Sequence, residues 1–119
     1  MPPDSTDPPG APLSPATYHI LLALAARDRH GYAIRRAVEE QSDGAVRLGP
    51  GTLYAAIRRL EDTGFIEESP WRPDADLDDE RRRYYRLTVQ GRNAVEAETE
   101  RLRATVKFAL RQLSLRPSR

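Results

Sequence analysis

Two adjacent arginines, Arg58 and Arg59, lie in a strongly helical stretch, LGPGTLYAAIRRLEDTGFI (residues 48–66). On a helical wheel they fall on or beside the polar face, one to two turns after Gly51 and Thr52. Small residues let a backbone approach another surface closely, and the first-turn amides of a helix suit a phosphate. Arginine pairs in bidentate fashion with guanine, so this pattern favours contact with duplex DNA.

The opposite face of this helix is apolar, with Leu53, Ala56, Ile57 and Leu60 at helical spacing. We expect that face to pack against two preceding helices, which is the arrangement of a helix-turn-helix. A simpler interpretation stays open, because Gly-Pro is a common helix entry and arginines on an outer face are often only solvated.

A second basic cluster follows, in which tyrosines interrupt a run of arginines (Arg81, Arg82, Arg83, Tyr84, Tyr85 and Arg86). Residues 65–71 and 81–87 contain β-formers and are predicted to pair as a hairpin. Such a hairpin suits a wing along the phosphate backbone, with one tyrosine facing the core and the other facing out. The loop between the strands is acidic: Asp74, Asp76, Asp78, Asp79 and Glu80.

Residues for other chemistry are sparse. His19 and His30 are the only histidines and there is no cysteine, so no metal site or cysteine nucleophile is expected. No serine has an evident base partner, and Glu96, Glu98 and Glu100 are interpreted as a solvated face. The sequence therefore predicts a protein that is not an enzyme and that uses no metal or other cofactor.

The 119 residues suffice for one domain, and the formal net charge of +1 does not itself indicate a nucleic-acid partner. The longest apolar cluster, residues 20–26, is far shorter than the ~20 residues that a membrane span needs. No secretory signal is evident, and the expected location is the cytoplasm.

Around the arginine-bearing helix, the sequence predicts a mainly α fold with a small β-hairpin. Residues 1–12 form an expected disordered tail. Helices are predicted from the Ser14-Pro15 entry to about Asp28, over 32–42, and over 50–63 with Gly64 as a left-handed cap. Thr88 is predicted to begin a last helix that runs to about residue 113. At about 39 Å this helix is longer than so small a globule can cover.

Three motifs carry a resemblance to a known family. HGYAI (residues 30–34), GPGTLYAAIRRLEDTGFI and RRRYYRLTVQGR resemble, in order, the PadR family of bacterial transcriptional regulators, over residues 14–92. The resemblance implies a winged helix-turn-helix over 13–88 and a dimerisation helix over 89–119. It implies a homodimer that binds a pseudo-palindromic operator and represses a nearby promoter until a small molecule or a cellular change releases it.

Site residues follow from the arginine-bearing helix and from the resemblance. The DNA-binding set is Tyr32, Gly51, Thr52, Tyr54, Arg58, Arg59, Arg81, Arg82 and Arg83. The dimer set is Leu21, Leu24, Val95, Leu102, Val106, Ala109 and Leu113. Tyr18 and Phe108 are candidates for lining an effector pocket, or else for packing the core or the dimer seam.

The chain departs from the family pattern at three places. Many members have a larger residue at Ala55 and a serine at Gly49, and the acidic wing loop is unusual. An alternative function is therefore a winged-helix module for protein contact, without specific DNA binding.

Overall fold

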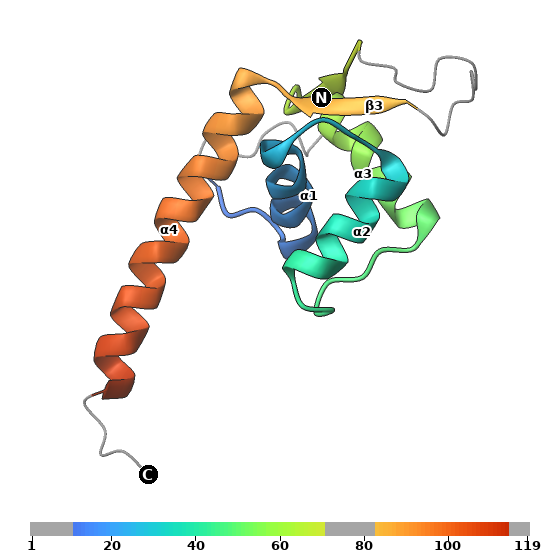
Figure 1. The fold of residues 1–119 in the computed structure, drawn as a ribbon. Coiled ribbons are helices and arrows are strands. Elements are labelled where there is room, and N and C mark those ends of the chain that lie inside the picture. Colours follow the sequence, from blue (N-terminus) through green and yellow to red (C-terminus); the bar gives the residue numbers. More distant parts are fainter. Residues whose placement is uncertain (1–10, 71–82, 115–119) are drawn as a thin grey trace.

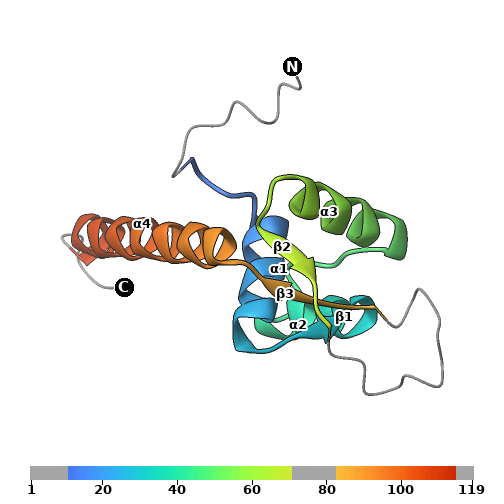
Figure 2. The same ribbon diagram turned by 90° about the horizontal axis from the view of Figure 1, so that it is seen from above.

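Three short helices form the body of the molecule. The computed structural model describes residues 11–70 and 83–114. In it, α1 (Pro15–Ala26), α2 (Gly31–Gln41) and α3 (Pro50–Asp62) are followed by the long α4 (Val89–Ser114). Figure 1 shows α4 running away from this body, and Figure 2 shows α2 and α3 on either side of α1.

The helix ends follow local capping chemistry. The Ser14 Oγ accepts a hydrogen bond from the Thr17 amide at 3.1 Å, which confirms the predicted entry to α1. Gly64 has φ +85°, and the Phe65 amide bonds to the Leu60 carbonyl at 3.0 Å. This is the predicted left-handed cap, with the additional hydrogen bond of a Schellman motif.

A three-stranded antiparallel sheet covers one end of the helical body. The predicted hairpin is present as β2 (Ile66–Glu68) and β3 (Tyr84–Leu87), both shorter than expected. A third strand, β1 (Arg29–His30), pairs with the other edge of β3, so the strand order is β1-β3-β2. The first helix, predicted to run to about Asp28, ends two residues earlier at Ala26, because Arg27 is already extended and leads into β1.

The prediction that one wing tyrosine faces out is also wrong. Tyr84 and Tyr85 are 9% and 6% exposed. At these two positions both faces of β3 are covered, although Arg86 further along the strand is exposed. Tyr85 joins the hydrophobic core, while the Tyr84 ring meets the His30 ring edge-to-face with centroids 5.2 Å apart.

The hydrophobic core draws on every helix and on the sheet. Its least exposed large side chains include Ile20, Leu21, Ile34, Leu53 and Ile57. From α4 only Val95 joins this cluster of buried apolar residues. One face of α3 therefore packs against the body, since Leu53, Ala56, Ile57 and Leu60 are all buried.

The first half of α4 packs on α1. The Tyr18 hydroxyl and Thr99 Oγ1 are hydrogen-bonded at 2.8 Å, and Glu98 accepts a bond from the Leu13 amide at 3.2 Å. Glu98 is 5% exposed and also pairs with Arg101 at 2.6 Å, so the interpretation of this glutamate as solvated is wrong. Beyond this contact the helix leaves the body (Figure 1).

Several predictions fall on parts of the chain outside the described residues. These are most of the expected tail, the acidic loop (74–80), Arg81 and Arg82.

Candidate nucleic-acid interface

The outer face of α3 presents the side chains that the sequence singled out. The exposed residues on this face are Gly51, Thr52, Ala55, Arg58 and Arg59, and the opposite face is buried. The predicted division of this helix into a core face and an outer face is confirmed.

The first turn of α3 is sterically open. Gly49 is the N-cap residue and supplies no side-chain hydrogen bond. A Cβ placed on Gly49 or Gly51 would meet nothing within 4 Å. These glycines are therefore not required by packing among the described residues. They leave the first-turn amides, which lie at the positive end of the helix dipole, accessible to an anion.

The α3 arginines form no ion pair within the described residues. Six of the thirteen arginines in residues 11–70 and 83–114 do form ion pairs: Arg36, Arg47, Arg83, Arg86, Arg101 and Arg103. Arg58 and Arg59 are among the seven that do not. Their guanidinium groups are available to a phosphate or a base edge without the loss of an internal pair.

Tyr54, which was predicted to contact DNA, also packs inside the protein. It is half-buried and packs against the core, and its ring lies over Gly31 at the start of α2. A Cβ at Gly31 would overlap the phenol, so only glycine admits this contact. Tyr54 thus fixes α3 against α2, a role that the sequence pattern did not reveal.

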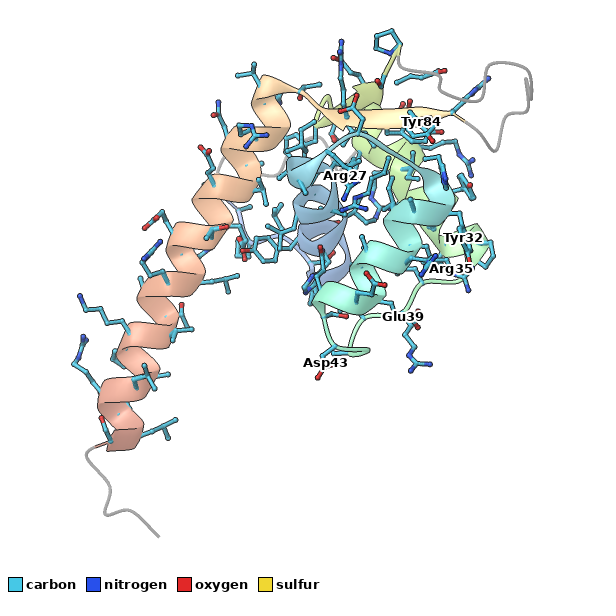
Figure 3. The ribbon with its side chains drawn as sticks, viewed as in Figure 1. Arg27, Tyr32, Arg35, Glu39, Asp43 and Tyr84 are labelled. Atoms are coloured by element: carbon cyan, nitrogen blue, oxygen red, sulfur yellow. The ribbon has the colours of Figure 1, made fainter. Side chains whose placement is uncertain are left out.

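Tyr32 is placed differently, with 56% of its surface exposed. Figure 3 shows it projecting from the start of α2 on the side away from α1. The ring stacks on His30 with centroids 6.5 Å apart, and the Arg36 guanidinium lies 6.0 Å from its centroid. His30 in turn caps α2, its Nδ1 accepting from the Ala33 amide at 3.1 Å. His30 was not predicted as a site residue, although its position directly before a helix was the available signal.

The two wing arginines that the structure describes form ion pairs. Arg86 Nε lies 2.8 Å from Glu67 Oε2, and Arg83 Nε lies 3.9 Å from Glu68 Oε2. Both acids belong to β2 and were missed as members of the site. The wing arginines that the structure describes are therefore partly neutralised from the neighbouring strand.

One carboxyl group links α3 to the wing. Burial raises the pKa of Glu61, and the negative charge of Glu68 raises it further, while Arg83 and Arg58 act in the opposite direction. Burial likewise raises the pKa of Tyr85, assisted by Glu61. The end of α3 therefore disfavours a negative charge at this point.

The predicted dimer residues divide into two groups. Leu21, Leu24 and Val95 are at most 3% exposed and fill the core of their own chain, so they cannot present a contact surface in this conformation. The second group lies on the projecting half of α4, where the exposed apolar side chains are Leu102, Val106, Phe108, Leu110 and Leu113. Ala109 is partly exposed there.

The two effector candidates are not brought together in one chain. Tyr18 is tied to Thr99, whereas Phe108 is 55% exposed and lies nine positions further along α4. At 1.5 Å per residue this corresponds to about 13 Å along the helix.

Two other kinds of site were sought in the described residues. No group of three or more His, Asp or Glu side chains that could hold a metal ion occurs among them. None of the described helices has both the length and the apolar character needed to cross a membrane.

Comparison with known proteins places this geometry in a family. Residues 20–97 match the model of the transcriptional regulator PadR-like family. An uncharacterized 37.1 kDa protein in a transposon of Streptomyces fradiae is 42% identical over 80 residues, which cover 66% of this chain. The chain spans only 20% of the length of that relative.

Solved structures agree with the family match. A PadR family transcription regulator from a hypervirulent Clostridium difficile superposes with a TM-score of 0.66 at 25% identity, covering 84% of this chain and 98% of that one. A transcriptional regulator from Clostridium thermocellum gives a TM-score of 0.62 at 29% identity, covering 81% of this chain and 87% of that one.

Proposed function

Because the chain belongs to the PadR-like family of transcriptional regulators, we propose that it binds a specific DNA operator as a homodimer, with α3 in the major groove. In this arrangement Arg58 and Thr52 contact base edges, Gly51 brings the first turn close to a phosphate, and Arg59 contacts the backbone. Tyr32 and the wing arginines, including Arg81 and Arg82, add flanking phosphate contacts.

The observation that carries this proposal is the outer face of α3. It combines an open first turn with two arginines that form no ion pair in the described parts of the chain. The amides without a side-chain cap and the two unpaired guanidinium groups lie on the same helix. Both features favour a polyanionic partner.

The projecting half of α4 supports the homodimer. Leu102, Val106 and Leu113 are 39%, 55% and 61% exposed, and Leu110 widens the apolar surface. A row of exposed apolar side chains on one helix is typical of a surface that another chain covers. A second copy of α4 matches it in length and character, and it places two α3 helices on one duplex.

We propose that binding represses a nearby promoter and that a small molecule relieves it. Since Tyr18 and Phe108 lie apart in one chain, a pocket that includes both requires the partner subunit's α4.

Operator binding is tested by selecting duplexes from random DNA and measuring affinity across a salt series. We expect one enriched pseudo-palindrome, with half-sites about 34 Å apart and an affinity that falls steeply with salt. Retention of no duplex even at low salt would favour a protein-contact module instead.

The dimer is tested by sedimentation equilibrium of Val106→Asp, which places a charge in the apolar row. We expect a monomer, because a buried unpaired carboxylate opposes association. Asn93→Asp, an exposed position at the start of α4, is the matched control and should stay dimeric. A dimeric Val106→Asp would remove this part of α4 from the interface.

A further inference from the structure

The end of α3 and the beginning of α4 are joined by one threonine side chain. The Thr88 hydroxyl donates to the Gly64 carbonyl at 2.5 Å and accepts from the Gly91 amide at 3.0 Å. The Thr88 amide also donates to the Phe65 carbonyl at 3.1 Å. Thr88 is thus both the N-cap of α4 and a bridge to the turn that terminates α3.

The joint has no spare room. Gly91 is buried, and a Cβ on it would overlap the carbonyl of Phe65, which is rigid backbone. The same Cβ would lie 3.1 Å from Leu87 Cδ2. The first turn of α4 therefore rests directly on the turn after α3, with backbone against backbone.

We infer that Thr88 is a positioning residue that fixes the angle between α3 and α4 and thereby sets the operator spacing that a dimer accepts. This inference rests on the proposed function. Between Gly91 and Val106, α4 rises about 22 Å, so a tilt of about 10° at the joint moves its far end by about 4 Å. That exceeds the 3.4 Å rise of one base pair along a strand. The tight joint therefore acts together with the contacts of Val95, Glu98 and Thr99 on the body to hold one spacing.

The experiment compares each chain on three duplexes: the selected operator, the same operator with one base pair inserted between half-sites, and a single half-site. In Thr88→Val both hydroxyl bonds are lost. We expect its preference for the natural spacing to fall about five- to tenfold, with half-site affinity unchanged. Thr88→Ser keeps the hydroxyl and should restore the preference.

Thr63→Val is the matched control. Its hydroxyl bonds only to the Leu60 carbonyl within the same turn, at 3.1 Å, and does not reach α4. It should keep the spacing preference. If Thr88→Val does not fold, Thr88→Asp replaces it, because aspartate caps a helix but cannot donate to Gly64. A folded variant that keeps the full preference overturns the inference.

A measurement without DNA separates this inference from the proposed function. The chain has no cysteine, so Asp62→Cys and Arg103→Cys accept two spin labels, on α3 and α4. Diluted with unlabelled chain, they should report one narrow distance in the parent and a broader distribution in Thr88→Val. An unchanged distribution contradicts the inference, whereas failure of every duplex to bind contradicts the proposed function alone.

Discussion

The outer face of α3 and the wing use the same amino acid in opposite ways. On α3, Arg58 and Arg59 form no ion pair within the described residues. On the wing, Arg86 and Arg83 face Glu67 and Glu68 of the adjacent strand. Both regions are arginine-rich in sequence, yet among the arginines that the structure describes in these two regions, those of the helix form no ion pair and those of the wing do.

The wing pairs follow from the register of β2 and β3. Cross-strand neighbours in an antiparallel pair lie within reach of each other, so acids on β2 meet bases on β3. On α3, Glu61 and Asp62 lie three and four positions after Arg58, a spacing at which helical side chains can meet, yet neither forms an ion pair with it in the structure. The number of arginines therefore overestimates the positive charge that the described part of the wing offers to DNA. A better measure of a DNA-binding surface is whether each arginine forms an ion pair within its own chain.

The largest expected effect is that of Arg58→Ala on operator affinity. Loss of a good bidentate base contact costs about 1–3 kcal/mol, or roughly 5- to 150-fold in affinity. Arg86→Ala should change affinity by less than about threefold, because its charge is already paired and exposed. Fluorescence anisotropy on the selected operator measures both, with Arg103→Ala on α4 as a charge-matched control. Equal losses from α3 and the wing would break the contrast between them.

Gly51→Ala should separate folding from binding. The first turn has room for a Cβ, and alanine favours a helix over glycine by up to about 1 kcal/mol, so the melting temperature should rise. The added methyl group holds the backbone away from the phosphate, and operator affinity should fall about tenfold. Ala55→Gly, which lowers helix propensity on the same face, is the comparison. A Gly51→Ala chain that binds normally would show that close approach of this turn is not required.

Removing the acidic partner of a wing arginine should change operator affinity less than these substitutions do, and should raise it. In Glu67→Gln, Arg86 loses its carboxylate partner and a negative charge leaves the wing. We expect operator affinity to rise by about two- to fivefold and the logarithmic salt slope to steepen by up to about one. Glu96→Gln, an exposed α4 change of equal charge, should leave both unchanged. An unaltered slope would place the wing away from the phosphates.

Local physics made much of the fold predictable. The two faces of α3, the Ser14 cap and the Gly64 cap follow from side-chain spacing and from the hydrogen-bonding groups near each helix end. The same helical spacing predicted which α3 side chains are exposed. The prediction that Thr88 begins α4 was also confirmed, by its bond to the Gly91 amide.

Contacts between distant segments could not be predicted in this way. The two residues of β1 are too few for any periodic pattern, and without β1 the burial of both Tyr84 and Tyr85 could not be inferred. Glu98 follows the polar pattern of its helix, yet it is buried by a contact with Leu13, 85 positions earlier. Helical spacing likewise says nothing of Gly31, whose missing side chain seats Tyr54.

Glu61 lies where the two compared regions meet, and it gives the smallest predicted effect. Its pKa in the folded chain is raised by burial and by Glu68, so the folded state binds this proton more tightly than the unfolded state. Stability from this group is therefore present below the ordinary glutamate pKa of about 4.3 and is lost as the pH rises through the folded value. At neutral pH, the charged Glu61 destabilises the fold.

Glu61→Gln removes that cost. We expect stability to rise by about 0.3 kcal/mol at pH 7, since the carboxylate is largely solvated and also lies near the negative end of the α3 dipole. Urea unfolding at pH 7 and at about pH 3.5 measures the change, which should vanish at the lower pH because the wild-type carboxyl group is then protonated. A gain of equal size at both pH values would trace the effect to packing instead of charge, and the junction between α3 and the wing would then be electrostatically neutral.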